Sequence, residues 1–130
     1  MAPRRISARN PPMYHHSLFE IVRQSGEKLL DLVVEMQSSQ ELFASPNTLK
    51  VVEELLLAMA NTLGHLPPAL HLRLPQVDWA GWAAVQDCLG SGRQPRQDEI
   101  WYAVCALVPA TLVLLDKLRQ REPELFEIIY

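Results

Sequence analysis

Four histidines are the side chains in this sequence best suited to proton transfer near neutral pH, and they occur in two pairs. His15 and His16 are adjacent, so on a helix their side chains diverge by about 100° and make a poor pair of metal ligands. His65 and His71 flank a proline-rich connection, without a cysteine or carboxylate at the spacing of a metal site. Ordinary surface or loop histidines are the simpler interpretation. We therefore expect no metal and no cofactor.

Three further motifs could bind a ligand, and each has a simpler explanation. Cys88 and Cys105 are too few for a disulfide framework or a zinc site, so we expect two reduced, buried side chains. The segment Gly90–Gly92 is too short for a phosphate-binding loop, and no helix follows it directly. Trp79 and Trp82 could stack on a base, but a tryptophan pair three residues apart more often anchors a core.

The overall charge gives no general attraction for nucleic acid. The chain has 12 basic and 15 acidic residues, a formal net charge of -3, whereas nucleic-acid binding favours a basic face. A local basic patch could still form from Arg93 and Arg96 on one loop together with Lys117, Arg119 and Arg121. A solvated face is the simpler interpretation. RNA is therefore a candidate partner that the net charge does not support.

Apolar residues recur three and four positions apart through most of the chain, which predicts helices and no strand. We expect an all-α fold, an up-and-down bundle of four to five helices, in one domain over residues 14–130. The predicted elements are a helix at about 14–37, a short turn at 41–44, a helix at about 45–63, a single helical turn at 67–72, a helix at about 79–89, a long helix from about 98 to 121, and a last turn to 130.

Several residues are well placed to start or bend these helices. Ser45 can accept a hydrogen bond from the first turn of its helix, and Pro46 suits the first helical position. Asp78 is expected to cap the short helix that follows it. Pro109 lies inside the last long helix, where it removes a hydrogen-bond donor, so we expect a kink or a break there.

The stretch Ile100–Leu115 carries no charge, and a helix that is apolar on nearly every side must be surrounded by protein or lipid. At about 16 residues with a proline inside, it is shorter than the roughly 20 needed to cross a bilayer. We therefore expect the central helix of a soluble bundle and no membrane. Residues 1–13 are basic and proline-rich without an apolar signal core, which predicts a flexible arm and a cytoplasmic protein.

The second half of the helix at 45–63 and the stretch Ile100–Leu115 carry more apolar sides than a small bundle can cover alone. Large exposed apolar patches usually mark interfaces, so we expect a homodimer. The residues assigned to this interface are Leu56, Met59, Leu63, Trp79, Trp82 and Trp101.

Six short motifs follow one another along the chain: Glu41–Phe43, Ser45–Thr48, Ala58–Leu63, Pro75–Trp79, Asp98–Trp101 and Leu107–Pro109. In this order and spacing they resemble the HepT-like helical domain of the HEPN group, over about residues 14–118. The last two motifs match best, because the family's final helix also begins near a Trp and contains a later Leu-Pro. The resemblance implies a helical bundle of the HEPN/HepT type.

The resemblance also implies a site, and there the sequence departs from the family. HepT-like proteins carry an Arg-x4-6-His element after the linker Trp, and it acts in RNA cleavage, usually across a dimer interface. Counting from Trp79, the family's Arg-Asn falls on Gln86-Asp87 and its His on Ser91, with Arg93 nearest to a Tyr that often follows. Neither Gln nor Ser can replace a His in proton transfer near neutral pH. We therefore expect a degenerate site.

A protein of this kind would work by binding. The resemblance implies a homodimer, or a complex with a nucleotidyltransferase of the MNT type, as in HEPN–MNT toxin–antitoxin modules. Two alternatives stay open. An active HEPN-type ribonuclease could use other groups, such as His65, His71, Asp87 and Arg93, and an unrelated helical adaptor or scaffold could match the motifs by accident.

Overall fold

The computed structural model describes residues 12–90 and 97–121, and within these ranges the chain is all-helical, as predicted. The elements are α2 (Pro12–Val33), α3 (Ser39–Phe43), α4 (Pro46–Gly64), α5 (Pro68–Arg73), α6 (Trp79–Gly90), α7 (Gln97–Tyr102), a π-helical turn η1 (Ala103–Leu107) and α8 (Val108–Arg121). Because α7, η1 and α8 form one continuous run, the described residues contain six helices, where four to five were expected. Most of the predicted arm and the predicted last turn lie outside them.

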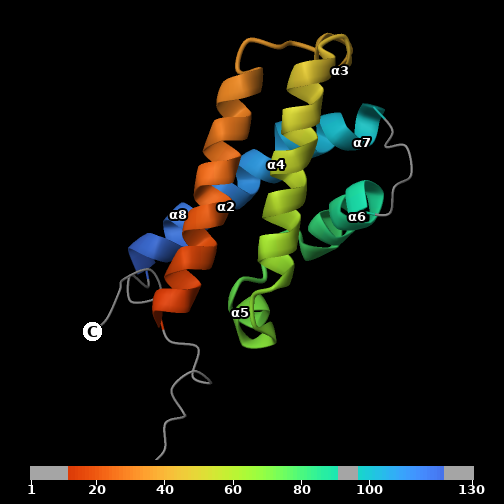
Figure 1. Cartoon of the computed structure of the whole chain (residues 1–130). Coiled ribbons are helices and arrows are strands. Elements are labelled where there is room, and N and C mark those ends of the chain that lie inside the picture. Colours follow the sequence, from red (N-terminus) through yellow and green to blue (C-terminus); the bar gives the residue numbers. More distant parts are fainter. Residues whose placement is uncertain (1–11, 91–96, 122–130) are drawn as a thin grey trace, which may run out of the picture.

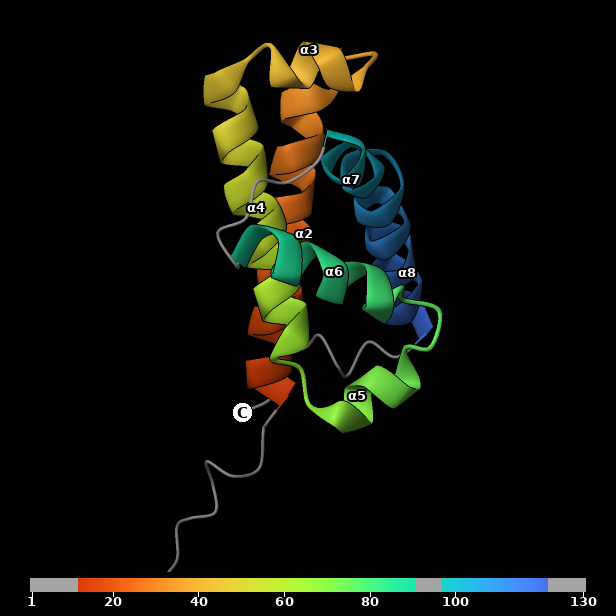
Figure 2. The same cartoon turned by 90° about the vertical axis from the view of Figure 1, so that its right-hand side faces the viewer.

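The two longest helices of the first half, α2 and α4, run antiparallel along each other, and α3 connects their upper ends (Figure 1). Helix α6 crosses α4 (Figure 2). The run α7–η1–α8 lies to the right of α4 in that view and contacts α2, α3 and α6. α5 lies in the connection between the lower end of α4 and the start of α6. Each helix therefore has one side against a shared interior.

The core fills the space where α2, α4, α6 and α8 meet. Its fully buried side chains include Phe19, Val22, Leu29, Val52, Leu56, Met59, Leu63, Trp82, Val108 and Leu118. Gly26 lets α2 come close to its neighbours, because a Cβ atom at this position would lie 2.9 Å from Leu112 Cδ2 and 3.1 Å from Met59 Cε. The apolar stripes read from the sequence thus face one another across a single core.

Helix α2 ends at Val33, earlier than the expected end near residue 37. A local capping arrangement explains the difference. Ser38 Oγ accepts from the Glu41 backbone N–H at 3.3 Å, while Glu41 Oε1 accepts from the Gln37 N–H at 2.9 Å. These bonds start α3 and hold the preceding residues out of α2. The predicted turn at 41–44 is therefore part of a short helix, and its Leu42 is buried as expected.

The predicted helix starts have mixed outcomes. Pro46 occupies the first turn of α4, as expected. The predicted Ser45 cap is wrong, because Ser45 Oγ donates instead to the Glu41 carbonyl at 3.1 Å. The predicted Asp78 cap is confirmed, since Asp78 Oδ1 accepts from the Gly81 N–H at 2.8 Å in the first turn of α6.

The expected distortion at Pro109 takes the form of the π-helical turn η1. Proline has no N–H, so the carbonyl four residues earlier, on Cys105, loses its α-helical donor and would clash with the ring. In η1 the Val108 N–H donates to the Ala103 carbonyl, five residues back. The wider turn lets the helix pass the proline without breaking, so α7 and α8 stay joined.

The joined helix Gln97–Arg121 has 25 residues, because helix continues into both charged flanks of the apolar stretch. By length and composition alone it could cross a membrane, and it is the one helix in the described ranges that passes this test. A core helix passes the same test, and 39% of the residues in its most apolar window are buried inside the bundle. Its buried side chains are Ile100, Ala103, Val104, Leu107, Val108, Thr111, Leu115 and Leu118.

One buried polar contact ties α6 to α8. Trp82 Nε1 donates to Thr111 Oγ1 at 2.9 Å, and Thr111 is the buried polar residue among the described core positions. We predict that Thr111→Val lowers the free energy of unfolding by about 1–3 kcal/mol, because the buried indole N–H loses its acceptor. Urea denaturation followed by circular dichroism measures the change.

Thr62→Val is the matched control. Thr62 is only partly buried, and its hydroxyl donates to the Ala58 carbonyl of its own helix at 2.7 Å. The same chemical change there leaves no buried donor without an acceptor, so its effect is expected to stay within about 0.5 kcal/mol. Equal effects at both sites would contradict the role assigned to the Trp82 bond.

Candidate functional site

The first half of α6 is fixed in position by its two tryptophans. Trp82 is buried in the core. Trp79 is half-buried, donates from Nε1 to the Leu74 carbonyl at 3.0 Å, and stacks on His71 with ring centroids 4.0 Å apart and an interplanar angle of 15°. These contacts support the reading of the tryptophans as anchors rather than base-stacking platforms. They also set the direction of the following turns of α6.

Those turns form one wall of an open groove of about 680 Å³ between α4 and α6. The groove is lined by Leu57, Asn61, Ala83, Gln86, Asp87 and Gly90, and we call it the α4–α6 groove. Gln86 Nε2 donates to Asn61 Oδ1 at 2.8 Å, which joins the two walls. Two of the sequence-predicted site residues, Gln86 and Asp87, therefore lie together at a polar groove. The other two, Ser91 and Arg93, lie outside the described residues.

The α4–α6 groove can form hydrogen bonds but has little means of proton transfer at neutral pH. Asp87 is the one titratable side chain among the lining residues described. The amides of Asn61 and Gln86 donate and accept hydrogen bonds without changing charge. The described lining contains no cation that could hold a phosphate. The chemistry available here is recognition of a polar group rather than acid–base catalysis.

His65, directly after α4, and His71, which lies in α5 rather than in the expected loop, both form hydrogen bonds with backbone carbonyls. His71 Nε2 lies 3.2 Å from the Leu63 carbonyl, and His65 Nδ1 lies 2.6 Å from the Asn61 carbonyl. Because a carbonyl only accepts, each of these ring nitrogens carries the donated proton. His71 also lines a pocket of about 110 Å³ together with Trp79, Trp82 and Gln86, beside the α4–α6 groove. In the described parts of the chain no three His, Cys, Asp or Glu residues gather as a metal site would require.

Four of the six predicted interface residues are not available to a partner. The side chains of Leu56, Met59, Leu63 and Trp82 are covered by the chain's own helices. The sequence pattern correctly marked them as apolar, but their neighbours are α2 and α6 rather than a second subunit. This part of the interface prediction is therefore corrected. Trp79 and Trp101 are only half-buried, and their role at an interface stays a prediction.

An exposed, uncharged face runs instead along α7, η1 and α8. It is formed by Tyr102, Cys105, Ala106, Ala110 and Val113, and we call it the outer face of the long helix. Tyr102 and Val113 each expose 53% of their surface. The prediction of two buried cysteines holds for Cys88 and is wrong for Cys105. Partial burial of the Cys105 thiol among its neighbours still raises its pKa.

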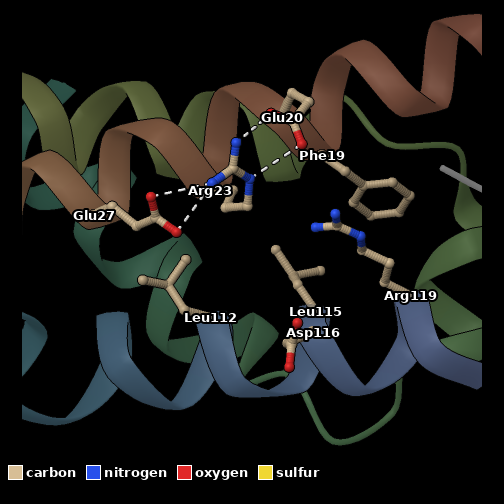
Figure 3. A pocket seen from close by; sticks show the side chains of 8 residues that line it. All are labelled: Phe19, Glu20, Arg23, Glu27, Leu112, Leu115, Asp116 and Arg119. Carbon is tan, nitrogen blue, oxygen red and sulfur yellow. Dashed lines mark hydrogen bonds and ion pairs between the residues drawn. The ribbon is translucent and has the colours of Figure 1, made fainter.

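Another hollow lies between α2 and α8 and holds about 140 Å³ (Figure 3). On α2, Arg23 bonds Glu20 at 2.6 Å and Glu27 at 3.1 Å. Its hydrogen bonds to Glu20 are the main cause of a raised pKa at Arg23, with burial opposing and Glu27 reinforcing the shift. Leu112, Leu115 and Arg119 extend from α8 toward these side chains. Because two carboxylates already neutralise Arg23, its presence in the hollow is explained by ion pairs within α2 and requires no bound ligand.

The three described cations of the predicted basic patch, Lys117, Arg119 and Arg121, do not gather in one place. Lys117 and Arg121 are four residues apart on α8 and line one hollow, whereas Arg119 lines the hollow against α2 on another side of the helix. Arg93 and Arg96 lie outside the described residues. Of the described patch residues, only Lys117 and Arg121 therefore share a surface.

Comparison with protein-family models finds no match, and comparisons with curated proteins and with solved structures find none either. The likeness to HepT-like proteins therefore depends on the sequence motifs alone. The α4–α6 groove is therefore characterised only by the residues that line it, without support from a similar protein.

Asn61 is the site residue that the motifs did not identify. With Thr62 it forms the polar pair in the otherwise apolar second half of α4, and this interruption was the available signal. Its partner Gln86 is 25 residues away in the sequence, so only the packing of α4 on α6 brings the two amides together.

We predict that His71→Ala lowers the free energy of unfolding by about 1–2 kcal/mol, because it removes the ring stacked on Trp79 and the bond to Leu63. Intrinsic tryptophan fluorescence of the folded protein should shift to longer wavelength as Trp79 becomes more exposed. His65→Ala is the control. That ring is exposed, so both readouts should stay close to wild type. A larger effect at His65 than at His71 would contradict this assignment.

Proposed function

We propose that this protein is a HepT-like up-and-down helical bundle that has lost the nuclease chemistry of that family and acts by binding. It would form a homodimer in the cytoplasm, or pair with a nucleotidyltransferase of the MNT type as in HEPN–MNT toxin–antitoxin modules. The proposal rests on the sequence motifs for the family and on the α4–α6 groove for the mode of action.

The observation that carries the proposal is the hydrogen bond between Gln86 and Asn61. Gln86 occupies the position at which the motif alignment expects an arginine. Its amide is held by Asn61 across the groove, and Asp87 adds a negative charge beside it. A site of this kind favours hydrogen-bonding partners such as protein backbone or polar side chains. It disfavours RNA, whose phosphates would meet an acid and no described cation.

An active ribonuclease is the second candidate. The observation in its favour is that His71 and Gln86 line one pocket beside the groove that contains Asp87. Two contacts weigh against a catalytic His71. Its Nε2 proton is donated to the Leu63 carbonyl, and its ring is packed against Trp79. An unrelated helical adaptor would share the binding function without the ancestry.

The outer face of the long helix is the surface we propose for self-association. It presents Tyr102 and Val113 to solvent and has no charge between them. A two-fold contact would place this face against its own copy, which removes the apolar area from water on both subunits at once. The face replaces the buried residues that the sequence pattern had assigned to an interface.

We predict that the purified full chain does not cleave RNA of mixed sequence, because the described lining of the α4–α6 groove contains no histidine or other group suited to proton transfer at neutral pH. Fluorescent RNA incubated with micromolar protein and separated on a gel provides the measurement. Installing the family's residues by Gln86→Arg with Ser91→His should produce cleavage that wild type lacks. Gln76→Arg, the same change outside the groove, is the matched control and should stay inactive.

Wild-type cleavage would contradict the loss of chemistry, and alanine variants would then identify the groups responsible. Cleavage that disappears in His71→Ala, with the fold intact by circular dichroism, would support the ribonuclease alternative. Cleavage that survives in both His65→Ala and His71→Ala would exclude that alternative's main residues.

We predict that wild type is a dimer at micromolar concentration and that Val113→Glu shifts it to monomer, because the contact would have to bury a carboxylate. Light scattering after size-exclusion chromatography measures the mass. Val34→Glu is the matched control, since Val34 is 75% exposed and lies away from the outer face, in the turn after α2. A strict monomer in the wild type would contradict the proposal.

Cysteine crosslinking locates the contact independently. Cys105 lies in the middle of the outer face, so a two-fold contact through it should yield a disulfide-linked dimer on mild oxidation. Cys105→Ser should abolish the linked dimer, and Cys88→Ser should retain it because Cys88 is buried. The raised pKa of Cys105 reduces its thiolate at neutral pH, so crosslinking should accelerate as pH rises beyond the usual thiol value of about 8.5.

A further inference from the structure

A small apolar pocket lies between α6 and α7, where the outer face of the long helix begins. It holds about 120 Å³ and is lined by Gly81, Ala84, Val85, Cys88, Glu99, Ile100 and Tyr102. We call it the α6–α7 pocket. Tyr102 belongs both to this pocket and to the outer face, so the two surfaces are continuous. The described linings of this pocket and of the α4–α6 groove share no residue.

The polar side chains of this lining already have partners. Cys88 Sγ donates to Glu99 Oε1 at 3.5 Å. Tyr102 Oη donates to Asp78 Oδ2 at 3.3 Å, at the start of α6. The rest of the described lining is apolar, and the volume is smaller than the roughly 300–1,000 Å³ that small-molecule sites occupy. The α6–α7 pocket is therefore suited to one aliphatic side chain rather than to a cofactor.

The outer face carries such a side chain at its opposite end. Val113 exposes 53% of its surface. Between it and Tyr102, the residues of this face are small: Cys105, Ala106 and Ala110. Short side chains let two helices pack closely, and the face extends over about 16 Å at 1.5 Å per residue. One surface thus holds an apolar projection at one end and an apolar pocket at the other.

A two-fold axis would bring these two ends together. Under such symmetry, a contact of one residue in the first copy with another residue in the second copy occurs twice. When the outer faces of two copies pack antiparallel, the Val113 end of each copy meets the Tyr102 end of the other. Both projections and both pockets are then covered at once. The arrangement is closed, so it forms a dimer rather than a filament.

We propose that Val113 of each copy occupies the α6–α7 pocket of a second copy. This contact rests on the proposed self-association of the outer face, and it adds α6 to the interface and an antiparallel arrangement of the two long helices. A second copy suits the pocket because the chain from Tyr102 to Val113 contains no charged residue. Two copies can therefore approach along this face without removing a charge from water.

Engineered disulfides test which residues meet, in a Cys88→Ala, Cys105→Ser background that removes both native cysteines. Ala84→Cys with Val113→Cys should give a linked dimer on mild oxidation, because a disulfide requires Cα atoms within about 7 Å. Ala83→Cys with Val113→Cys is the matched control and should stay unlinked. Ala83 is also exposed on α6 but lines the α4–α6 groove instead. Each single cysteine variant should stay unlinked as well.

Dimer affinity gives a second measurement in the chain with its native cysteines. Val113→Ala should raise the dissociation constant of the dimer at least tenfold, because each dimer loses the apolar contact of two valine side chains. Val34→Ala makes the same change at an exposed position in the turn after α2 and should stay within twofold of wild type. Sedimentation equilibrium measures both constants, and circular dichroism confirms the fold of each variant.

The outcomes separate the pocket contact from self-association itself. A wild-type dimer whose Ala84→Cys, Val113→Cys variant stays unlinked would overturn the pocket contact and leave self-association in place. Equal linking of the Ala83→Cys pair, or an unchanged dissociation constant in Val113→Ala, would do the same. A wild type that stays monomeric would overturn both.

Discussion

The hydrogen bond between Trp82 and Thr111 is the contact on which the arrangement of this bundle depends. It joins α6 to α8 through the interior, where an unpaired indole N–H would be costly. Trp82 can lie in the core only in the orientation that this bond allows. Because α6 is a rigid helix, the orientation of Trp82 also fixes Gln86 one turn further on, where its amide meets Asn61. A core contact thus determines the geometry of a surface groove.

The same long helix explains how a proline is tolerated in the centre of the fold. The π-helical turn accommodates Pro109 by moving one hydrogen bond from the i−4 to the i−5 carbonyl. The buried residues of the run, from Ile100 in α7 to Leu115 and Leu118 in α8, keep the three- and four-residue spacing of one helical stripe. The irregular turn therefore leaves the run with a single side toward the interior. The cost of the irregular turn is offset by burial along both halves.

Much of the fold could be predicted from local chemistry, and the rest depended on tertiary contacts. Pro46, Asp78 and Pro109 act through their own backbone neighbourhood, so their positions gave a helix start, a cap and a distortion. The end of α2 was missed because Glu41 reaches back to Gln37, a contact that competes with helix continuation. For the site, motif order led to Gln86 and Asp87. The bond between Asn61 and Gln86 and the burial of Leu56 could not be predicted, since both depend on which helix covers α4.

The hydrophobicity of the long helix alone does not show which of its apolar side chains face the core. In the structure its two sides lie in different environments. The side with Val104, Val108 and Leu115 is covered by the bundle and needs no other explanation. The side with Tyr102 and Val113 contributes nothing to that core, and single exposed apolar residues on a protein surface are ordinary. Here several follow one another over three turns without an intervening charge. Such continuity does not lower the energy of an isolated bundle in water, and it is the reason for proposing that this side self-associates.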